Sequence, residues 1–252
     1  MIGTVLLKQY QVVSFLGQGA MGKVFLARHR TTADVVVIKV LNKDRAKDAS
    51  ARQFFDREIQ SLAELNHPCI VGFRGADFDD PAGPCIAMEF IPGVTLESLL
   101  ERHHRLSVDQ VHRLLLPLCR ALNYGHARHV IHRDLKPANL MVIDPDTVRE
   151  SLKVMDFGLA QLDAKPHISL DKLRGHDRGT ACGTPMYVAP EGLRGDPVDH
   201  RADIYSVGIV LFELLTGAPP FNYSDTNTVL NAHLNDRPPR FSQRRGHVEV
   251  PP

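Results

Sequence analysis

The residue types most able to do chemistry lie in two polar stretches beside apolar runs. The first is 132–139 (HRDLKPAN), between Val130-Ile131 and the run 140–142 (LMV). Its charged side chains cannot all be buried, so we expect a loop between two short strands that presents them together. The second is 156–158 (DFG), which follows the run 152–155; by itself this motif indicates only a turn. At neighbouring strand ends, Asn139 and Asp156 would supply the oxygen ligands that suit Mg²⁺.

Three glycines, Gly17, Gly19 and Gly22, fall between two runs of β-branched and aromatic residues. Glycine lets a backbone approach a polyphosphate closely and point its N–H groups at the oxygens. The same spacing occurs in dinucleotide sites, where the third glycine opens a helix. Here residues 23–27 (KVFLA) continue as a strand. The pattern therefore favours a phosphate-binding loop between two antiparallel strands.

Lys39 is the charged residue of the apolar run 36–40 (VVIKV). A lysine there is costly to bury unpaired, although an edge lysine can also extend its amine to solvent. Glu58, on the next helical stretch, offers a partner, although a lone glutamate there is typical of a solvated helix face.

The surrounding pattern predicts two regions of different secondary structure. Up to residue 91 we expect strands at 10–16, 23–27, 35–40 and 85–91 and one helix over 52–65. Pro92-Gly93 marks the boundary between lobes, and helices dominate after it. Residues 107–110 (SVDQ) are typical of a capping box that opens a long helix. The run 204–215 predicts a helix buried on nearly all sides that ends at Gly217.

Composition excludes several classes of protein. The 252 residues carry a formal net charge of +1, which gives no electrostatic footprint for nucleic acid or an anionic membrane. The four cysteines match no zinc spacing. The most apolar run falls short of the roughly 20 residues that a membrane helix needs. We expect a cytoplasmic protein without a membrane segment, or one at the cytoplasmic face if a longer parent chain carries an anchor.

In order and spacing, these motifs resemble the signature set of eukaryotic-like (Hanks-type) serine/threonine protein kinases. Residues 189–191 (APE) complete the set, which runs from about residue 10 to at least residue 221. The stretches 183–191 (GTPMYVAPE) and 203–208 (DIYSVG) are similar to the bacterial branch. The resemblance implies an α+β bilobal fold: a small antiparallel N-lobe with one helix over about 1–91, and a larger helical C-lobe over about 92–252. The family continues through further helices, so we expect the last C-lobe helices to be missing.

The resemblance also implies catalytic roles. Asp134 would accept the proton of the substrate hydroxyl, and Lys136 would steady the transferred phosphate. Lys39 would hold the α- and β-phosphates and pair with Glu58. Mg²⁺, or Mn²⁺ as an alternative, would be held by two ligands, Asn139 and Asp156.

The nucleotide would be ATP, covered by the glycine loop. Met88 resembles the gatekeeper of this site, and the backbones of Glu89 and Ile91 would bond to adenine. The ATP-binding set is Leu16, Gly17, Gln18, Gly19, Ala20, Met21, Gly22, Lys23, Val24, Val37, Lys39, Met88, Glu89, Ile91 and Met141. A stacked apolar spine would comprise Leu62, Phe73, His132 and Phe157, with Asp203 beneath it.

The implied activity is ATP-dependent phosphorylation of serine and threonine hydroxyls on proteins, by a non-specific serine/threonine protein kinase. We expect autophosphorylation at Thr180, whose phosphate would pair with Arg133, whereas Thr184 would be structural. The expected partners are protein substrates and a second copy of the chain for trans-autophosphorylation. Two alternatives remain: a catalytically inactive, kinase-shaped binding or scaffold module, and a small-molecule kinase.

Overall fold

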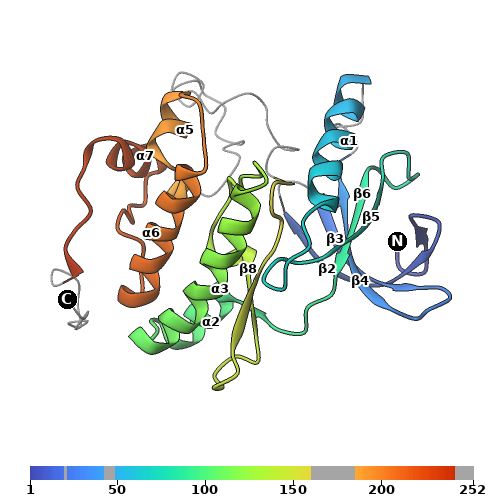
Figure 1. Cartoon of the computed structure of the whole chain (residues 1–252), viewed down its shortest axis with the longest axis horizontal. Coiled ribbons are helices and arrows are strands. Elements are labelled where there is room, and N and C mark those ends of the chain that lie inside the picture. Colours follow the sequence, from blue (N-terminus) through green and yellow to red (C-terminus); the bar gives the residue numbers. More distant parts are fainter. Residues whose placement is uncertain (20–21, 43–48, 160–184, 242–252) are drawn as a thin grey trace. The chain divides into compact units, whose positions relative to one another are not determined.

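The computed structural model describes residues 1–19, 22–42, 49–159 and 185–241 (Figure 1). They form two compact units, one up to Pro92 and the other from Gly93 onward. Within the described residues, no helix has the length and hydropathy needed to cross a membrane.

The first unit is built on a six-stranded antiparallel sheet in the order β1-β2-β3-β4-β6-β5. The strands are β1 (Val5–Leu6), β2 (Tyr10–Gly19), β3 (Gly22–His29), β4 (Val35–Leu41), β5 (Phe73–Asp77) and β6 (Cys85–Glu89). Helix α1 (Ala49–Ala63) follows β4 in the chain. The predicted strands and helix are confirmed, with shifted ends. β2 runs three residues further than expected, because Gly17, Gln18 and Gly19 still pair with β3.

The core of this unit follows the two-residue period of its strands. Val36, Ile38 and Val40 on β4 join a buried apolar cluster with Phe25 and Ala27 of β3. Residues 37 and 39 of the same strand therefore point to the opposite face. This alternation turns Lys39 away from the apolar cluster.

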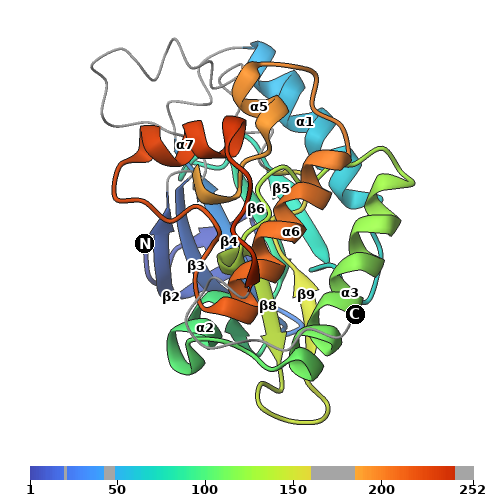
Figure 2. The same cartoon turned by 90° about the vertical axis from the view of Figure 1, so that its left-hand side faces the viewer.

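The second unit combines helices with a three-stranded antiparallel sheet in the order β7-β8-β9. The strands are β7 (Val94–Thr95), β8 (Leu140–Ile143) and β9 (Ser151–Val154). The helices are α2 (Leu96–His103), α3 (Val108–His126), α5 (Pro190–Arg194), α6 (Arg201–Thr216) and α7 (Thr226–Asn235), with 3-10 turns η2 (Pro137–Asn139) and η4 (Pro185–Tyr187). Figure 2 shows α7 beside α5.

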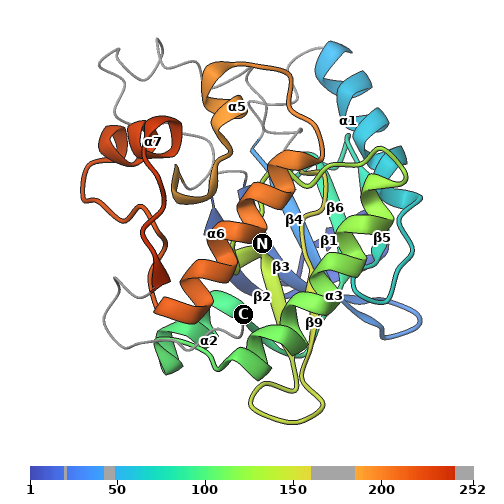
Figure 3. The same ribbon diagram turned by 60° about the vertical axis from the view of Figure 1, so that its left-hand side comes forward.

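Helix α3 is the long helix that the sequence predicts. Its stripe of Val111, Leu114, Leu118 and Leu122 is buried, and α3 packs beside α6 (Figure 3). Ser107 caps it, since its hydroxyl accepts the Gln110 N–H at 3.3 Å. The predicted capping box is only half formed, because the Gln110 side chain donates instead to Glu150.

Two other predictions in this unit need correction. Helix α6 ends at Gly217 in the left-handed region (φ 85°), as expected. It is not buried on nearly all sides, since Ile204 is 56% exposed. The loop 132–139 has a strand on its C-terminal side only, because Val130 and Ile131 form none.

Candidate active site

The loop 132–139 is held by one buried carboxylate, that of Asp203 on α6. Oδ2 of Asp203 accepts the His132 N–H at 2.9 Å, and Oδ1 accepts the Arg133 N–H at 2.9 Å. Nε2 of His126 lies 2.7 Å from Oδ2. Arg133 adopts φ 67°, a conformation rare for a residue with a Cβ, so the bond to its N–H offsets a strained backbone. Asp203 therefore fixes the backbone that precedes Asp134.

The side chains of Lys136 and Asn139 both contact Asp134. Nζ of Lys136 lies 2.9 Å from Oδ2 of Asp134 and 3.2 Å from Oδ1. Nδ2 of Asn139 donates to the Asp134 carbonyl at 2.7 Å and to its Oδ2 at 2.9 Å. Asp134 and Lys136 are half-buried, so the pair has access to solvent.

The orientation of the Asn139 amide follows from these bonds. A carbonyl and a carboxylate only accept hydrogen bonds, so the amide atom facing Asp134 must be nitrogen. Oδ1 of Asn139 then receives no donor from the described residues. An amide oxygen without a protein donor fits the ligand set of Mg²⁺, which takes one or two protein oxygens together with phosphates and water.

Asp156 is placed next to this loop by its neighbour Met155. The Met155 N–H donates to the Asn139 carbonyl at 2.9 Å. The Met155 carbonyl lies 2.9 Å from Nε2 of His132. Asp156 itself has φ 52°, in the left-handed region. These contacts bring the two predicted metal ligands, Asn139 and Asp156, onto adjoining backbone.

Phe157, the residue after Asp156, is held in place by ring packing. Its buried ring meets the His132 ring edge-on, with centroids 5.2 Å apart. It also fills the space in front of Gly125, where a Cβ would lie 2.6 Å from Cε1 of Phe157. Only glycine fits at position 125 of α3 beside this ring.

In the first unit, four predicted ATP-binding side chains share one sheet face, those of Val24, Val37, Lys39 and Met88. Directly opposed residues of antiparallel strands lie on the same face. Val24 opposes Lys39, and Val37 opposes Met88. Val37 and Lys39 are two residues apart on β4 and therefore also share a face. Lys39 and Glu58 are both buried, with 7% and 8% exposure.

The three glycines of the loop differ in what surrounds them. Gly22 has φ 155°, and a Cβ there would lie 2.9 Å from Cα of Leu41, so the protein itself requires glycine. At Gly17 and Gly19, no atom of the described residues lies within 4 Å of an added Cβ. Open space at these two positions fits the close approach of a ligand.

The remaining predicted residues are distributed as follows. Leu16 and the Gln18–Lys23 pair lie on β2 and β3, Glu89 is on β6, Ile91 follows it, and Met141 lies on β8 in the second unit. Ala20, Met21, Thr180 and Thr184 lie outside the described residues. The Arg133 side chain is exposed.

Sequence reasoning missed His126, which pairs with Asp203. A signal was present, because Leu118, Leu122 and His126 recur four residues apart and so continue the buried stripe of α3. A histidine that continues such a stripe needs a polar partner.

Comparisons with known proteins agree with this geometry. Residues 10–248 match the protein kinase domain family. The chain is 35% identical over 251 residues to the serine/threonine-protein kinase Pkn3 of Myxococcus xanthus, covering 100% of this chain and 45% of that protein. It is 38% identical over 233 residues to PknB of Mycobacterium tuberculosis, covering 91% of this chain and 36% of that protein. The chain thus spans less than half the length of these two relatives.

Among solved structures, the fold is similar to the kinase domain of PknI from Mycobacterium tuberculosis. The TM-score is 0.72 at 29% sequence identity, covering 97% of this chain and 84% of that one. The antiparallel sheet unit and the helical unit are those of the protein kinase fold, as the sequence predicts. The predicted resemblance to bacterial serine/threonine kinases is confirmed by these relatives, and the chain belongs to the protein kinase domain family.

Proposed function

We propose that this chain transfers the γ-phosphate of ATP to serine and threonine hydroxyls of proteins. The observation that carries the proposal is the triad Asp134, Lys136 and Asn139, in which Lys136 and Asn139 both contact Asp134 on a loop anchored by Asp203. The names of the bacterial relatives support serine and threonine as acceptors. An intact triad argues against the alternative of a catalytically inactive binding module.

Each member of the triad has a chemical task in this reaction. The Asp134 carboxylate accepts the proton of the attacking hydroxyl, and the Lys136 ammonium balances charge on the phosphoryl group in transfer. Oδ1 of Asn139 and the carboxylate of Asp156 would hold Mg²⁺, or Mn²⁺ in its place. When bound, the metal would neutralise negative charge on the phosphate oxygens. The protein thus contributes position and compensating charge more than covalent chemistry.

ATP would bind along the sheet face shared by Val24, Val37, Lys39 and Met88. Lys39 would hold the α- and β-phosphates with Glu58 as its partner, and Gly17 and Gly19 would allow the backbone to approach them. The backbones of Glu89 and Ile91, together with Met141, would complete the adenine contacts.

Proteins are the proposed acceptors, and a second copy of the chain is the proposed partner for trans-autophosphorylation. Thr180 would be the modified residue and Arg133 its phosphate receptor, because the Arg133 side chain is exposed. Thr184 would be structural. We place the reaction in the cytoplasm or at the cytoplasmic face of a membrane.

The test is transfer of labelled phosphate from ATP to a serine/threonine protein mixture and to a panel of small-molecule alcohols. The wild type is compared with Asp134→Asn and with Asp144→Asn, a matched change on the exposed loop between β8 and β9. Loss of a general base lowers rates by about 10²–10⁴-fold. We expect that loss in Asp134→Asn, unchanged rates in Asp144→Asn, and protein as the preferred acceptor.

Three results would contradict the proposal. Equal transfer rates in the wild type and in Asp134→Asn would show that Asp134 is not the general base. Transfer to alcohols alone would indicate a small-molecule kinase. ATP binding without transfer to any acceptor would indicate an inactive binding module.

A further inference from the structure

Helix α1 carries Glu58, the proposed partner of Lys39, and it is attached to the turn formed by residues 78–84 between β5 and β6. β5 is the described element that α1 contacts most. The buried Phe55 ring of α1 meets the Phe78 ring of the turn edge-on, with centroids 5.4 Å apart. Phe55 and Glu58 are three residues apart and therefore lie on the same side of the helix. The contact with Phe78 thus sets the rotation of α1 that directs Glu58.

An ion pair accompanies this ring contact. The guanidinium carbon of Arg52, one helical turn before Phe55, lies 5.4 Å from the centroid of the Phe78 ring. Nη1 of Arg52 donates to Oδ2 of Asp79 at 2.6 Å. Both side chains of the pair are exposed, at 50% and 64%, so the pair by itself stabilises little. The attachment of α1 therefore depends on how firmly the turn holds Phe78.

Asp80 holds the 78–84 turn in place. The residue is buried, and Oδ1 of its carboxylate accepts the Ala82 N–H of the same turn at 2.9 Å. Oδ2 accepts the N–H of Leu7, just after β1, at 2.8 Å. The Asp80 carbonyl accepts the Gly83 N–H at 2.8 Å. Leu7 has φ 47°, in the left-handed region, so the bond to its N–H offsets a strained backbone. The carboxylate thus joins the turn to a segment far away in the chain.

We propose that Asp80 is a positioning residue for phosphate transfer: it fixes the 78–84 turn, the turn holds α1, and α1 directs Glu58 toward Lys39. This inference rests on the proposed function, because that function assigns Lys39 to the phosphates of ATP. Lys39 and Glu58 are both buried, and a buried charge is costly to leave poorly paired. A change in the rotation of α1 therefore acts directly on the lysine that would hold the nucleotide.

The test compares Asp80→Asn with Asp34→Asn, a matched change on the exposed turn between β3 and β4. Asparagine presents one oxygen in place of two, so one of the two backbone N–H groups loses its acceptor. Steady-state kinetics use ATP and a serine/threonine protein mixture as the acceptor. A misplacement of about 1 Å can cost about a hundredfold in rate. We expect kcat/KM for ATP to fall about tenfold in Asp80→Asn, where the anchor is only partly lost, and less than about twofold in Asp34→Asn.

Two further measurements separate positioning from a general loss of stability. If Asp80 acts through Glu58, the double variant Asp80→Asn, Glu58→Gln should be no slower than Glu58→Gln alone, whereas independent losses multiply. Amide hydrogen exchange over residues 51–62 of α1 should be faster in Asp80→Asn, while exchange over residues 111–122 of α3 stays as in the wild type. If Asp80→Asn does not fold, Phe78→Ala replaces it, since the half-buried Phe78 ring contacts α1 directly.

The outcomes distinguish this inference from the proposed function. Losses that multiply in the double variant, or exchange over residues 51–62 that is equal in Asp80→Asn and the wild type, overturn the role of Asp80. A wild type that transfers no phosphate, although α1 exchanges faster in Asp80→Asn, supports the anchoring of α1 by Asp80 and overturns the proposed phosphate transfer.

Discussion

Nε2 of His126 lies 2.7 Å from Oδ2 of Asp203, the carboxylate that also holds the backbone of the loop 132–139. Burial alone would raise the pKa of Asp203, but the hydrogen bond from His126 and the bonds from the two backbone amides outweigh it and lower that pKa. Asp203 therefore stays charged in the fold, and its replacement leaves several buried donors without an acceptor.

We predict that Asp203→Asn lowers the free energy of unfolding by about 3 kcal/mol, because removing one partner of a buried charged network leaves the others unsatisfied. Urea denaturation measures this. Asp199→Asn, which breaks an exposed pair with Arg201, should cost less than about 1 kcal/mol. Similar losses in the two variants would contradict the role assigned to Asp203.

Gly125→Ala should destabilise the protein by about 1–3 kcal/mol, because its Cβ would overlap the Phe157 ring. Gly208→Ala on α6 is the matched control. Its Cβ would lie more than 4 Å from every neighbour in the described part of the chain, so the higher helix propensity of alanine should stabilise the protein by up to about 1 kcal/mol. Thermal denaturation compares the two variants. A stabilising Gly125→Ala would show that Phe157 has room to move.

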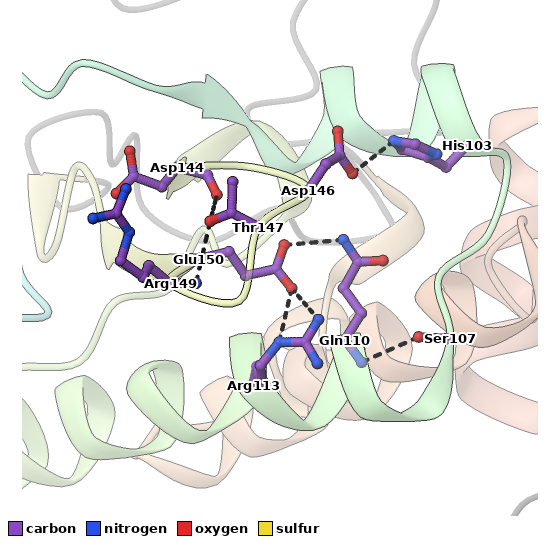
Figure 4. A network of polar contacts seen from close by, with 9 residues as sticks. All are labelled: His103, Ser107, Gln110, Arg113, Asp144, Asp146, Thr147, Arg149 and Glu150. Carbon is purple, nitrogen blue, oxygen red and sulfur yellow. Dashed lines mark hydrogen bonds and ion pairs between the residues drawn. The ribbon is translucent and has the colours of Figure 1, made fainter.

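A buried carboxylate joins the β8–β9 loop to helix α3 (Figure 4). The Glu150 side chain is fully buried, and it accepts from Nη2 of Arg113 at 2.8 Å and from Nε2 of Gln110 at 3.0 Å. We predict that Arg113→Met costs about 3 kcal/mol of stability, since it leaves a buried charge unpaired. The double variant Arg113→Met, Glu150→Leu should recover most of that loss, because an apolar pair of similar size replaces the ions.

A double-mutant cycle in urea measures this recovery. Additive losses from the two single changes would show that Glu150 and Arg113 do not stabilise the fold as a pair.

The pH dependence of the free energy of unfolding should reveal the protonation of His233. Its pKa in the fold is lowered by burial, while the unfolded value is about 6.5. As pH falls below about 6.5, the unfolded chain binds a proton that the folded ring resists, so stability declines through that window down to the folded pKa. His233→Gln has no such proton and should lose less stability between pH 7 and pH 5. Equal slopes in the two proteins would show that His233 protonates without cost.

The sequence was sufficient to predict elements with strong local signals. Period-two strands, the apolar stripe of α3 and Gly217 at the end of α6 all appear as expected, and Asp134, Lys136 and Asn139 meet in the second unit. Predictions from the local sequence were wrong where a residue far away in the chain competes for the same side chain. Gln110 was expected to cap α3, but the buried Glu150 carboxylate, forty residues away, takes its side chain. Ile204 sits in an apolar run yet faces outward, which residue type alone does not reveal.

The bonds of Lys136 and Asn139 to Asp134, and the anchor on Asp203, join protein groups of one unit to one another. Conformational entropy of this loop is thus already lost on folding. A nucleotide that arrives need not supply the free energy to order it, so more of its intrinsic contact energy remains as affinity.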